Sequence, residues 1–278
     1  MTGQTHLLFL DDSKQNDAPR DGMDDLVAIG GVAVAANKAS DLNKRINEEC
    51  LKQFGLPENE PFKWNPPKNG WIKRNLEPDQ RAALVRSVLA IAKDFDVFAL
   101  VSMCGKKTSP LGGAETHEMS ALLLTLERFQ KQLRTDDTGL VIIDRPGGNF
   151  VSEEKYLTVC ADMVASGSDY AAFNRLACPI LSMPFALSRT LQIADLVVSI
   201  TAAHFAGRPG AAEFFPHVLP LFSLDKDRRG GVSVKIHPDY KFRNLYHWLL
   251  KDEHFVWGHS GAPLPFSDMP YAKSAEAY

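Results

Sequence analysis

This 278-residue chain has few cysteines, no excess of basic residues and no long apolar runs. The 31 Lys and Arg residues against 34 Asp and Glu give a formal net charge of -3, which is not typical of a heavily basic nucleic-acid coat protein. This overall net charge is still compatible with a local basic groove. No C-x-x-C pair occurs, so neither a zinc motif nor a disulfide framework is indicated, and reduced, buried thiols are expected. The cysteines are Cys50, Cys104, Cys160 and Cys178.

Signals for secretion or membrane insertion are also missing from the sequence. Residues 1–6 lack a basic segment followed by an apolar run. The longest apolar stretches have the length of a strand or contain polar breaks, so none is expected to span a bilayer. The sequence therefore predicts a cytoplasmic protein without membrane association.

Several catalytic motifs begin in this chain but are not completed. Residues 105–108 resemble the end of a phosphate-binding loop, yet Leu100 stands where its leading glycine is required. His117 and Glu118 start like a zinc-protease helix, but Ala121 replaces the second histidine. No G-x-G-x-x-G, no G-x-S-x-G and no internal repeat is present. These absences exclude the common signatures of several enzyme classes.

The chain does contain enough apolar sequence, 45% of its residues, to build a core of alternating strands and helices. The pattern predicts strands at 6–10, 26–36, 96–103, 139–143 and 177–181. It predicts helices at 40–54 (capped by Ser40), 78–93, 115–133, 151–165, 190–205 and 240–250. The first two strands pair most simply as an antiparallel hairpin around a polar loop at 13–25. Gly30 and Gly31 indicate a bulge or a close backbone approach.

These elements predict one α/β core with additions. The core covers residues 1–206 and includes a helical insertion around 38–93. Residues 207–260, rich in turns, form a C-terminal elaboration packed on the core. Residues 261–278 have few large aliphatic side chains, which predicts a mobile tail.

Three aspartates are placed on otherwise apolar elements. Asp11 and Asp144 each end an apolar strand, and Asp195 interrupts an apolar helix. An isolated ionised carboxylate is costly to bury, so a shared cation would offset that cost. Two carboxylate-bridged cations about 3.5–4 Å apart are a common means of hydrolysing phosphodiesters, and carboxylates suit Mg²⁺ or Mn²⁺. We therefore expect the three side chains to converge as catalytic residues and metal ligands.

Other interpretations of the aspartates stay open. Asp11 or Asp12, and also Asp144, could simply begin turns. Asp195 is harder to explain in this way, because Asp has a poor helix propensity, but it could form a buried salt bridge with Arg189. We expect Asp195 to lie near the N-terminal end of its helix. The helix residues expected to pack against the sheet are Ile193, Leu196, Val197 and Ile200.

Four segments together carry a family resemblance. They read Phe-Leu-Asp-Asp-Ser at 9–13, Phe-Lys-Trp-Asn at 62–65, Leu-Val-Ile-Ile-Asp at 140–144 and Leu-Gln-Ile-Ala-Asp-Leu-Val at 191–197. On these segments the chain resembles the domain-of-unknown-function 3800 family over about residues 6–205. The resemblance implies a ribonuclease-H-like mixed sheet, with antiparallel first strands and later strands that alternate with helices. It also implies a nuclease-type acidic centre of Asp11, Asp144 and Asp195.

The chain departs from the family pattern at two motifs. Asp12 and Lys14 replace the glutamate and glycine of a first motif that commonly reads Asp-Glu-Ser-Gly. Pro61 stands where the family usually carries a glutamate, two positions before Lys63. The candidates for a fourth metal ligand are therefore Glu60, one residue out of register, and Glu118.

Cations and indoles are mixed in one proline-rich segment, which contains Lys63, Trp64, Lys68, Trp71, Lys73 and Arg74. Such a mixture is typical of single-strand binding, although both tryptophans could instead cover the edge of the core. The predicted substrate contacts are Asp12, Ser13, Lys63, Trp64 and Gln192. A second basic cluster, between residues 226 and 235, is better explained as a solvated hairpin tip.

The sequence thus favours a Mg²⁺- or Mn²⁺-dependent nuclease or phosphodiester transferase that acts on DNA or RNA. One alternative is a catalytically inactive nucleic-acid-binding or regulatory protein on the same fold, in a phage-defence or mobile-element setting by family analogy. Another is a small-molecule enzyme with an all-parallel, doubly wound sheet. The sequence leaves the oligomeric state open.

Overall fold

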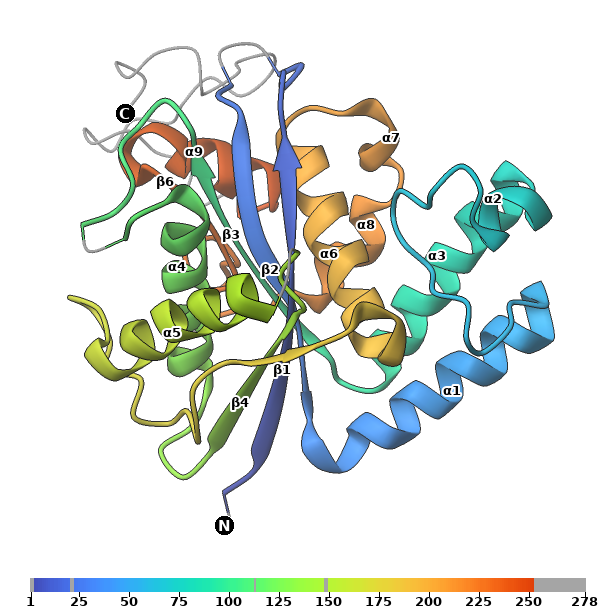
Figure 1. The fold of residues 1–278 in the computed structure, drawn as a ribbon. Coiled ribbons are helices and arrows are strands. Elements are labelled where there is room, and N and C mark those ends of the chain that lie inside the picture. Colours follow the sequence, from blue (N-terminus) through green and yellow to red (C-terminus); the bar gives the residue numbers. More distant parts are fainter. Residues whose placement is uncertain (1–2, 21–22, 113, 148–149, 253–278) are drawn as a thin grey trace. The chain divides into compact units, whose positions relative to one another are not determined.

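The computed structural model describes residues 3–20, 23–112, 114–147 and 150–252. Their strands form a six-stranded sheet in the order β5-β4-β1-β2-β3-β6 (Figure 1). The first three strands are antiparallel, whereas β4 on β1, β5 on β4 and β6 on β3 are parallel. The strands are β1 (Thr5–Gln15), β2 (Leu26–Ala35), β3 (Phe98–Gly105), β4 (Thr138–Asp144), β5 (Leu181–Met183) and β6 (Val234–His237). This mixed α/β arrangement is that of ribonuclease-H-like folds, as predicted, and it excludes an all-parallel sheet.

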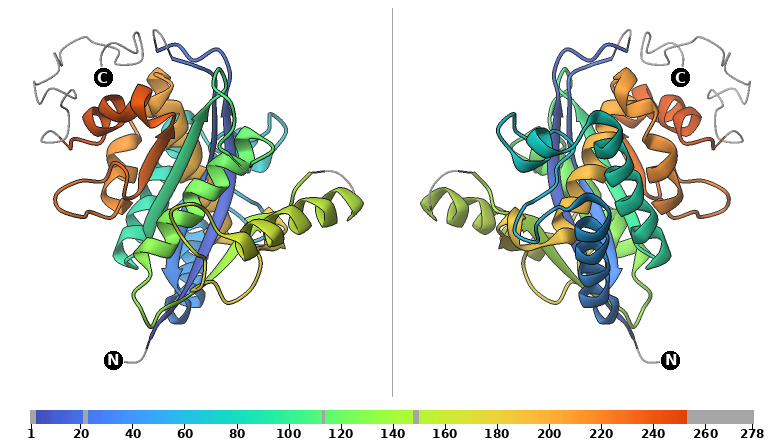
Figure 2. Two further views of the ribbon diagram at one scale, coloured as in Figure 1. Left: turned by 90° about the vertical axis from the view of Figure 1, so that its left-hand side faces the viewer. Right: turned by 90° about the vertical axis from the view of Figure 1, so that its right-hand side faces the viewer.

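The helices lie between the strands in sequence. In chain order they are α1 (Ala36–Phe54), α2 (Trp71–Asn75), α3 (Pro78–Asp94), α4 (His117–Gln132), α5 (Phe150–Ser166), α6 (Arg189–Phe205), α7 (Pro209–Ala212), α8 (Phe215–Val218) and α9 (Asp239–Leu249). Two 3₁₀ turns, η1 (Phe185–Leu187) and η2 (Leu219–Leu221), complete them. Each of the six predicted helices is present. In Figure 2, α5 extends away from β4, and Cys160 is its one buried side chain.

The chain divides into two compact units, each built from three segments. The first unit contains the segment up to Asp11, then Gly31–Phe98 and Phe129–Val197. The second contains Asp12–Gly30, Ala99–Arg128 and the chain from Val198 onward. This division falls inside β1, β2, β3, α4 and α6, so it differs from the predicted boundary at residue 206. That boundary stays a prediction, and the predicted tail at 261–278 lies outside the described residues.

Three local predictions are corrected by the structure. Helix α1 begins at Ala36 rather than at Ser40, and its N-cap Ala35 offers no side-chain hydrogen bond. Strand β1 continues to Gln15, because its polar residues alternate between buried and exposed positions and so keep the period of a strand. The strand predicted at 177–181 is instead β5, which begins two residues after Pro179, a residue without the N–H that a strand ladder needs.

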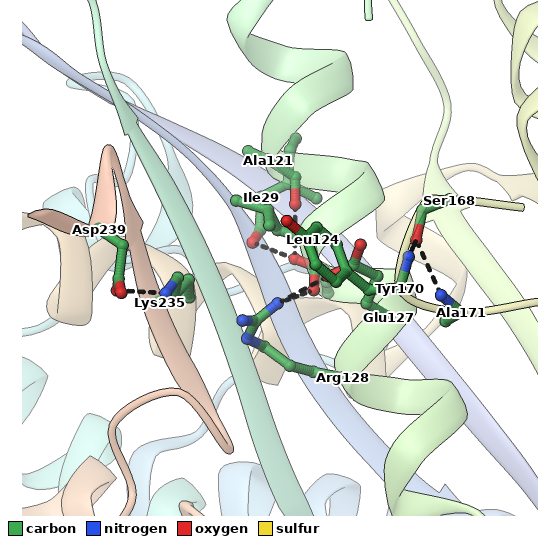
Figure 3. A network of polar contacts seen from close by, with 11 residues as sticks. Ile29, Ala121, Leu124, Glu127, Arg128, Ser168, Tyr170, Ala171, Lys235 and Asp239 are labelled. Carbon is green, nitrogen blue, oxygen red and sulfur yellow. Dashed lines mark hydrogen bonds and ion pairs between the residues drawn. The ribbon is translucent and has the colours of Figure 1, made fainter. Parts of the chain in front are cut away.

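The second unit contains a network of charged side chains, of which Glu127 and Arg128 are buried (Figure 3). Arg128 of α4 donates a hydrogen bond of 2.6 Å to the carbonyl of Leu124, and its Nη1 lies 3.6 Å from Oε2 of Glu127. Lys235 of β6 pairs with the partly exposed Asp239. Asp239 also accepts a 2.6 Å hydrogen bond from the Tyr246 hydroxyl. A buried charge such as that of Arg128 is tolerated when it is paired. Lys235, which the sequence placed in a basic cluster, therefore has a structural partner.

The other end of that basic cluster is a turn in the second unit. Asp225 and Arg228 form an isolated antiparallel bridge, and Lys226 and Asp227 between them are exposed and have positive φ angles. This geometry agrees with the interpretation of the segment as a solvated tip.

Candidate acidic site of the first unit

The first two predicted site residues, Asp11 and Asp144, occupy adjacent positions on two neighbouring strands. Strands β1 and β4 pair in parallel up to Leu10 opposite Ile143, so Asp11 and Asp144 are the next residue of each strand. Neighbouring strands lie about 4.8 Å apart, and side chains alternate between faces with a period of two. Both carboxylates therefore project from the same face of the sheet, at adjacent positions. Asp11 is buried and Asp144 is half-buried.

The third residue, Asp195, is carried by α6, which packs closely on Gly31 of β2. A Cβ atom on Gly31 would stand 2.0 Å from the carbonyl oxygen of Phe9 in β1 and 2.8 Å from Cβ of Ala194 in α6. Only a glycine therefore leaves room for both β1 and α6 at this point. Because Ala194 precedes Asp195 and Phe9 lies two residues before Asp11, this glycine brings the helix of one carboxylate near the strand of another. The close approach predicted at Gly30 and Gly31 is confirmed.

Asp195 is held by a backbone donor rather than by the start of its helix. It is the seventh residue of α6, beyond the first turn, so the predicted position near the N-terminal end is wrong. Its Oδ2 atom accepts a 2.6 Å hydrogen bond from the backbone N–H of Trp64, and the residue is 9% exposed. The helix neighbours predicted to be buried, Ile193, Leu196, Val197 and Ile200, each have an exposure of 0%.

Arg189, the salt-bridge partner considered for Asp195, instead donates several hydrogen bonds, most of them to the segment that precedes Trp64. Its guanidinium donates to Oδ1 of Asn47 at 2.6 Å and to Oε1 of Gln192 at 2.8 Å. It also donates to the backbone carbonyls of Pro57, Glu58 and Glu60. Arg189 therefore fixes the 57–60 segment against α1 and α6.

Gln192 has a related role in this structure, although the sequence predicts it as a substrate contact. The residue is 1% exposed. Its Oε1 atom accepts a hydrogen bond from the backbone N–H of Phe62, and its Nε2 atom donates to the carbonyl of Phe185. The amide is thus engaged by the protein itself, and it anchors the chain two residues before Trp64.

The positive charge of Lys63, a residue between these anchored positions, acts on Asp144. Its Nζ atom lies 3.9 Å from the centroid of the Phe185 ring. Burial raises the pKa of Asp144 above its ordinary value, and the charge of Lys63 and backbone hydrogen bonds from Arg145 and Phe185 oppose that rise. The pKa of Asp144 stays raised, so the nearby positive charge does not fully offset the cost of burying this carboxylate.

The remaining predicted residues lie in different surroundings. In the second unit, Asp12 is exposed, while Ser13 is buried and accepts a hydrogen bond from Gln15. Glu118, also in the second unit, pairs with Lys14 at 2.5 Å. Glu60 is half-buried, and the bond its backbone carbonyl accepts comes from Arg189. The exposed cations of the proline-rich segment are Lys68, Lys73 and Arg74, and the half-buried indoles are Trp64 and Trp71.

A divalent cation fits the donor chemistry of this site but not a ready-made set of three ligands. Carboxylate oxygens are the donors that Mg²⁺ and Mn²⁺ prefer. Within the described residues, however, no three His, Cys, Asp or Glu side chains are arranged to hold a metal ion. The assignment of Asp11, Asp144 and Asp195 as metal ligands stays a prediction, and loading the site would require local rearrangement.

The cysteines take no part in these contacts. All four are free; Cys50, Cys104 and Cys160 are buried, as predicted, whereas Cys178 is half-buried. Burial raises the pKa of Cys50 and Cys160 to about 11 and that of Cys104 to about 12. These thiols are therefore protonated at neutral pH and are poor nucleophiles.

Phe185 is the site residue that sequence reasoning missed. Its ring underlies Lys63, its N–H supports Asp144, and its carbonyl accepts from Gln192. The residue belongs to the short η1 turn after Pro184, where no hydrophobic period is long enough to be recognised. Because Phe185 lies more than a hundred residues from Lys63, no local sequence pattern indicates that the two side chains meet.

Comparison with known proteins gives no family assignment: no family model and no curated protein sequence matches the chain. No helix in the described part of the chain is long and apolar enough to cross a membrane.

Proposed function

We propose that this chain is a Mg²⁺- or Mn²⁺-dependent nuclease or phosphodiester transferase that acts on nucleic acid through Asp11, Asp144 and Asp195. The observation that carries the proposal is the register of β1 and β4, which puts two carboxylates at adjacent positions on one face of a ribonuclease-H-like sheet. Gly31 of β2 lies close to both Phe9 of β1 and Ala194 of α6, so the helix of the third carboxylate comes near the same strand. The resemblance of four segments to the domain-of-unknown-function 3800 family supports the same conclusion.

The proposed reaction assigns separate tasks to the residues of the site. A divalent cation, when bound, would supply an activated water and offset the charge of the phosphate. Asp11 and Asp144 would hold that cation from neighbouring strands, where the sheet fixes their spacing. Asp195 would complete the set from α6. Lys63 and the exposed cations Lys68, Lys73 and Arg74 bind the phosphate backbone, and the indole of Trp64 offers a surface on which a base stacks.

A second function is favoured by one specific observation. The backbone N–H of Trp64 already donates to Asp195, and the charge of Lys63 already acts on Asp144. A protein that had lost catalysis would keep its acids satisfied internally in this way. On this view the chain binds nucleic acid, or regulates a partner, without cleaving anything.

Cleavage of labelled single- and double-stranded DNA and RNA, with Mn²⁺ and with EDTA, tests the proposal. We expect Mn²⁺-dependent cleavage of at least one of these four substrates. Replacing Asp144→Asn should lower the rate by about 100-fold or more, because a metal ligand is lost. The matched control is Asp162→Asn, an exposed carboxylate on α5. It should cleave at the wild-type rate.

The same experiment separates the two functions. Binding of nucleic acid without cleavage in any metal would favour the inactive protein. Cleavage that is equally fast in the Asp144→Asn protein would show that the activity comes from another site or from a contaminant.

A further inference from the structure

One short segment acts on two of the three acidic residues, on one by a hydrogen bond and on the other through its charge. In the 62–64 segment, the N–H of Trp64 donates to Asp195, and the charge of Lys63, whose Nζ atom lies over the Phe185 ring, acts on Asp144. The hydrogen bond joins parts of the chain that are far apart in sequence, since Trp64 and Asp195 are 131 residues apart. Both interactions supply positive charge or a hydrogen-bond donor, which is what a carboxylate requires when no cation is bound.

The segment is anchored on one side and more open on the other. Before Lys63, the chain is fixed by the bonds of Arg189 to residues 57–60 and by the bond from the Phe62 N–H to Gln192. Phe62 itself is buried, with 1% exposure. After Trp64, Asn65, Pro67, Lys68 and Asn69 are exposed. Several hydrogen bonds thus fix the chain before Lys63, whereas the residues after Trp64 are mostly exposed.

The acidic site therefore has two competing sources of positive charge. The carboxylate donors suit Mg²⁺ or Mn²⁺, yet the described conformation holds no preformed set of three ligands. The Asp195 oxygen bonded to Trp64 would have to exchange that bond for one to the metal. The positive charge of Lys63, which acts on Asp144, would oppose the arrival of a divalent cation there.

We propose that the 62–64 segment is an internal competitor of the metal: Lys63 and the Trp64 N–H hold Asp144 and Asp195 until a divalent cation displaces them. This inference rests on the proposed function, because it takes these carboxylates as metal ligands. Binding of the cation and release of the segment are then thermodynamically linked, and each opposes the other by the same free energy. Release also frees Lys63 and the Trp64 indole to contact nucleic acid.

Calorimetric titration of the full chain with Mn²⁺ tests the charge competition. Lys63→Met removes the ammonium group, and its unbranched thioether can still pack on the Phe185 ring. We expect Lys63→Met to bind Mn²⁺ about tenfold more tightly than the wild type, within the usual range for coupled sites. Lys44→Met, which changes an exposed lysine of α1 in the same unit, is the matched control and should bind like the wild type.

Hydrogen exchange at the Trp64 amide tests the displacement directly. In the metal-free protein this amide is protected by its bond to Asp195. Saturating Mn²⁺ should speed its exchange by about tenfold or more, whereas the amides of β1 and β4 should not change. Lys63→Gln provides a second variant for both measurements, in case the methionine protein does not fold.

The outcomes distinguish this inference from the proposed function. In one outcome the wild type binds Mn²⁺ and cleaves nucleic acid, but Lys63→Met binds Mn²⁺ no more tightly and the Trp64 amide stays protected. This outcome overturns the competition and leaves the nuclease proposal standing. Should none of the folded proteins bind Mn²⁺, both proposals are overturned. Tighter binding in Lys63→Met together with faster exchange at Trp64 establishes the competition.

Discussion

The backbone N–H of Trp64 donates a 2.6 Å hydrogen bond to Oδ2 of Asp195. Because the donor is a main-chain group, no side-chain substitution at residue 64 removes it directly. The acceptor can be changed, so substitutions of Asp195 separate its role as a hydrogen-bond acceptor from its role as a negative charge.

Asp195→Asn should leave the fold almost unchanged and weaken Mn²⁺ binding. The amide oxygen can still accept from Trp64, so we expect a loss of less than about 1 kcal/mol in the free energy of unfolding, measured by urea titration in EDTA. Asp195→Ala leaves the N–H of Trp64 without this acceptor and should cost about 1–3 kcal/mol. If Asp195 were instead half of a buried salt bridge, even Asn would cost roughly 3–5 kcal/mol. That result would argue against a ligand role.

Arg189→Lys should loosen the 57–64 segment. Lysine keeps the charge but loses the planar fork that reaches Asn47, Gln192 and three carbonyls. We expect the free energy of unfolding to fall by roughly 2–4 kcal/mol and proteolytic cleavage between residues 57 and 64 to become faster. Arg74→Lys, at an exposed position of α2, is the control and should resemble the wild type. Equal stability of the two variants would refute a structural role for the hydrogen bonds of Arg189.

Gly31→Ala should destabilise the first unit by crowding β1 and α6 against β2. The added Cβ would lie 2.0 Å from the Phe9 carbonyl oxygen and 2.8 Å from Cβ of Ala194, so β1 and α6 would both have to move away from β2. Overpacking of this kind typically costs about 1–3 kcal/mol, which a thermal melt resolves as a fall of several degrees. Gly210→Ala in α7 meets no atom within 4 Å and should melt at or slightly above the wild-type temperature. A Gly31→Ala protein that melts with the control would contradict the close packing.

Mild acid should destabilise the protein through His204. Burial, reinforced by the charges of Arg20 and Lys251, lowers the pKa of His204 from 6.5 to about 4. The unfolded chain therefore takes up a proton near pH 6.5 that the folded protein does not accept until about pH 4. The stability that comes from keeping this ring neutral is complete above pH 6.5, declines as the pH falls through this interval and is lost below it. A difference of this size is worth about 3 kcal/mol.

His204→Phe isolates this contribution, because phenylalanine cannot titrate and can still stack on Phe215, whose ring centroid lies 4.0 Å from that of His204. Burial also lowers the pKa of His6 and His237, but both remain in the variant and cancel in the comparison. Urea titrations at pH 7 and pH 4 should show a smaller loss of stability in His204→Phe. Identical losses in the two proteins would exclude His204 as their source.

The sequence by itself determined the local elements of this protein. Short continuous apolar runs predicted the first four strands, because strands such as β2 and β3 are buried on both faces. The 3.6-residue period of apolar residues predicted the six helices, because it reflects which face of a helix meets the core. The glycine pair in β2 predicted the close approach that Gly31 makes. The prediction failed where polar residues of β1 keep a strand period, and where the three-residue strand β5 is too short to show one.

Tertiary structure alone decided how the candidate site is assembled. Asp11 and Asp144 become neighbours through the register of two strands that lie more than a hundred residues apart. Asp195 is satisfied by a backbone N–H, and a backbone donor leaves no trace in the identity of the residue that carries it. The contact of Lys63 with Phe185 likewise depends on how the chain returns to the sheet. Periodicity reports which face of an element is buried, whereas partners across the sheet follow from pairing and packing that no local pattern encodes.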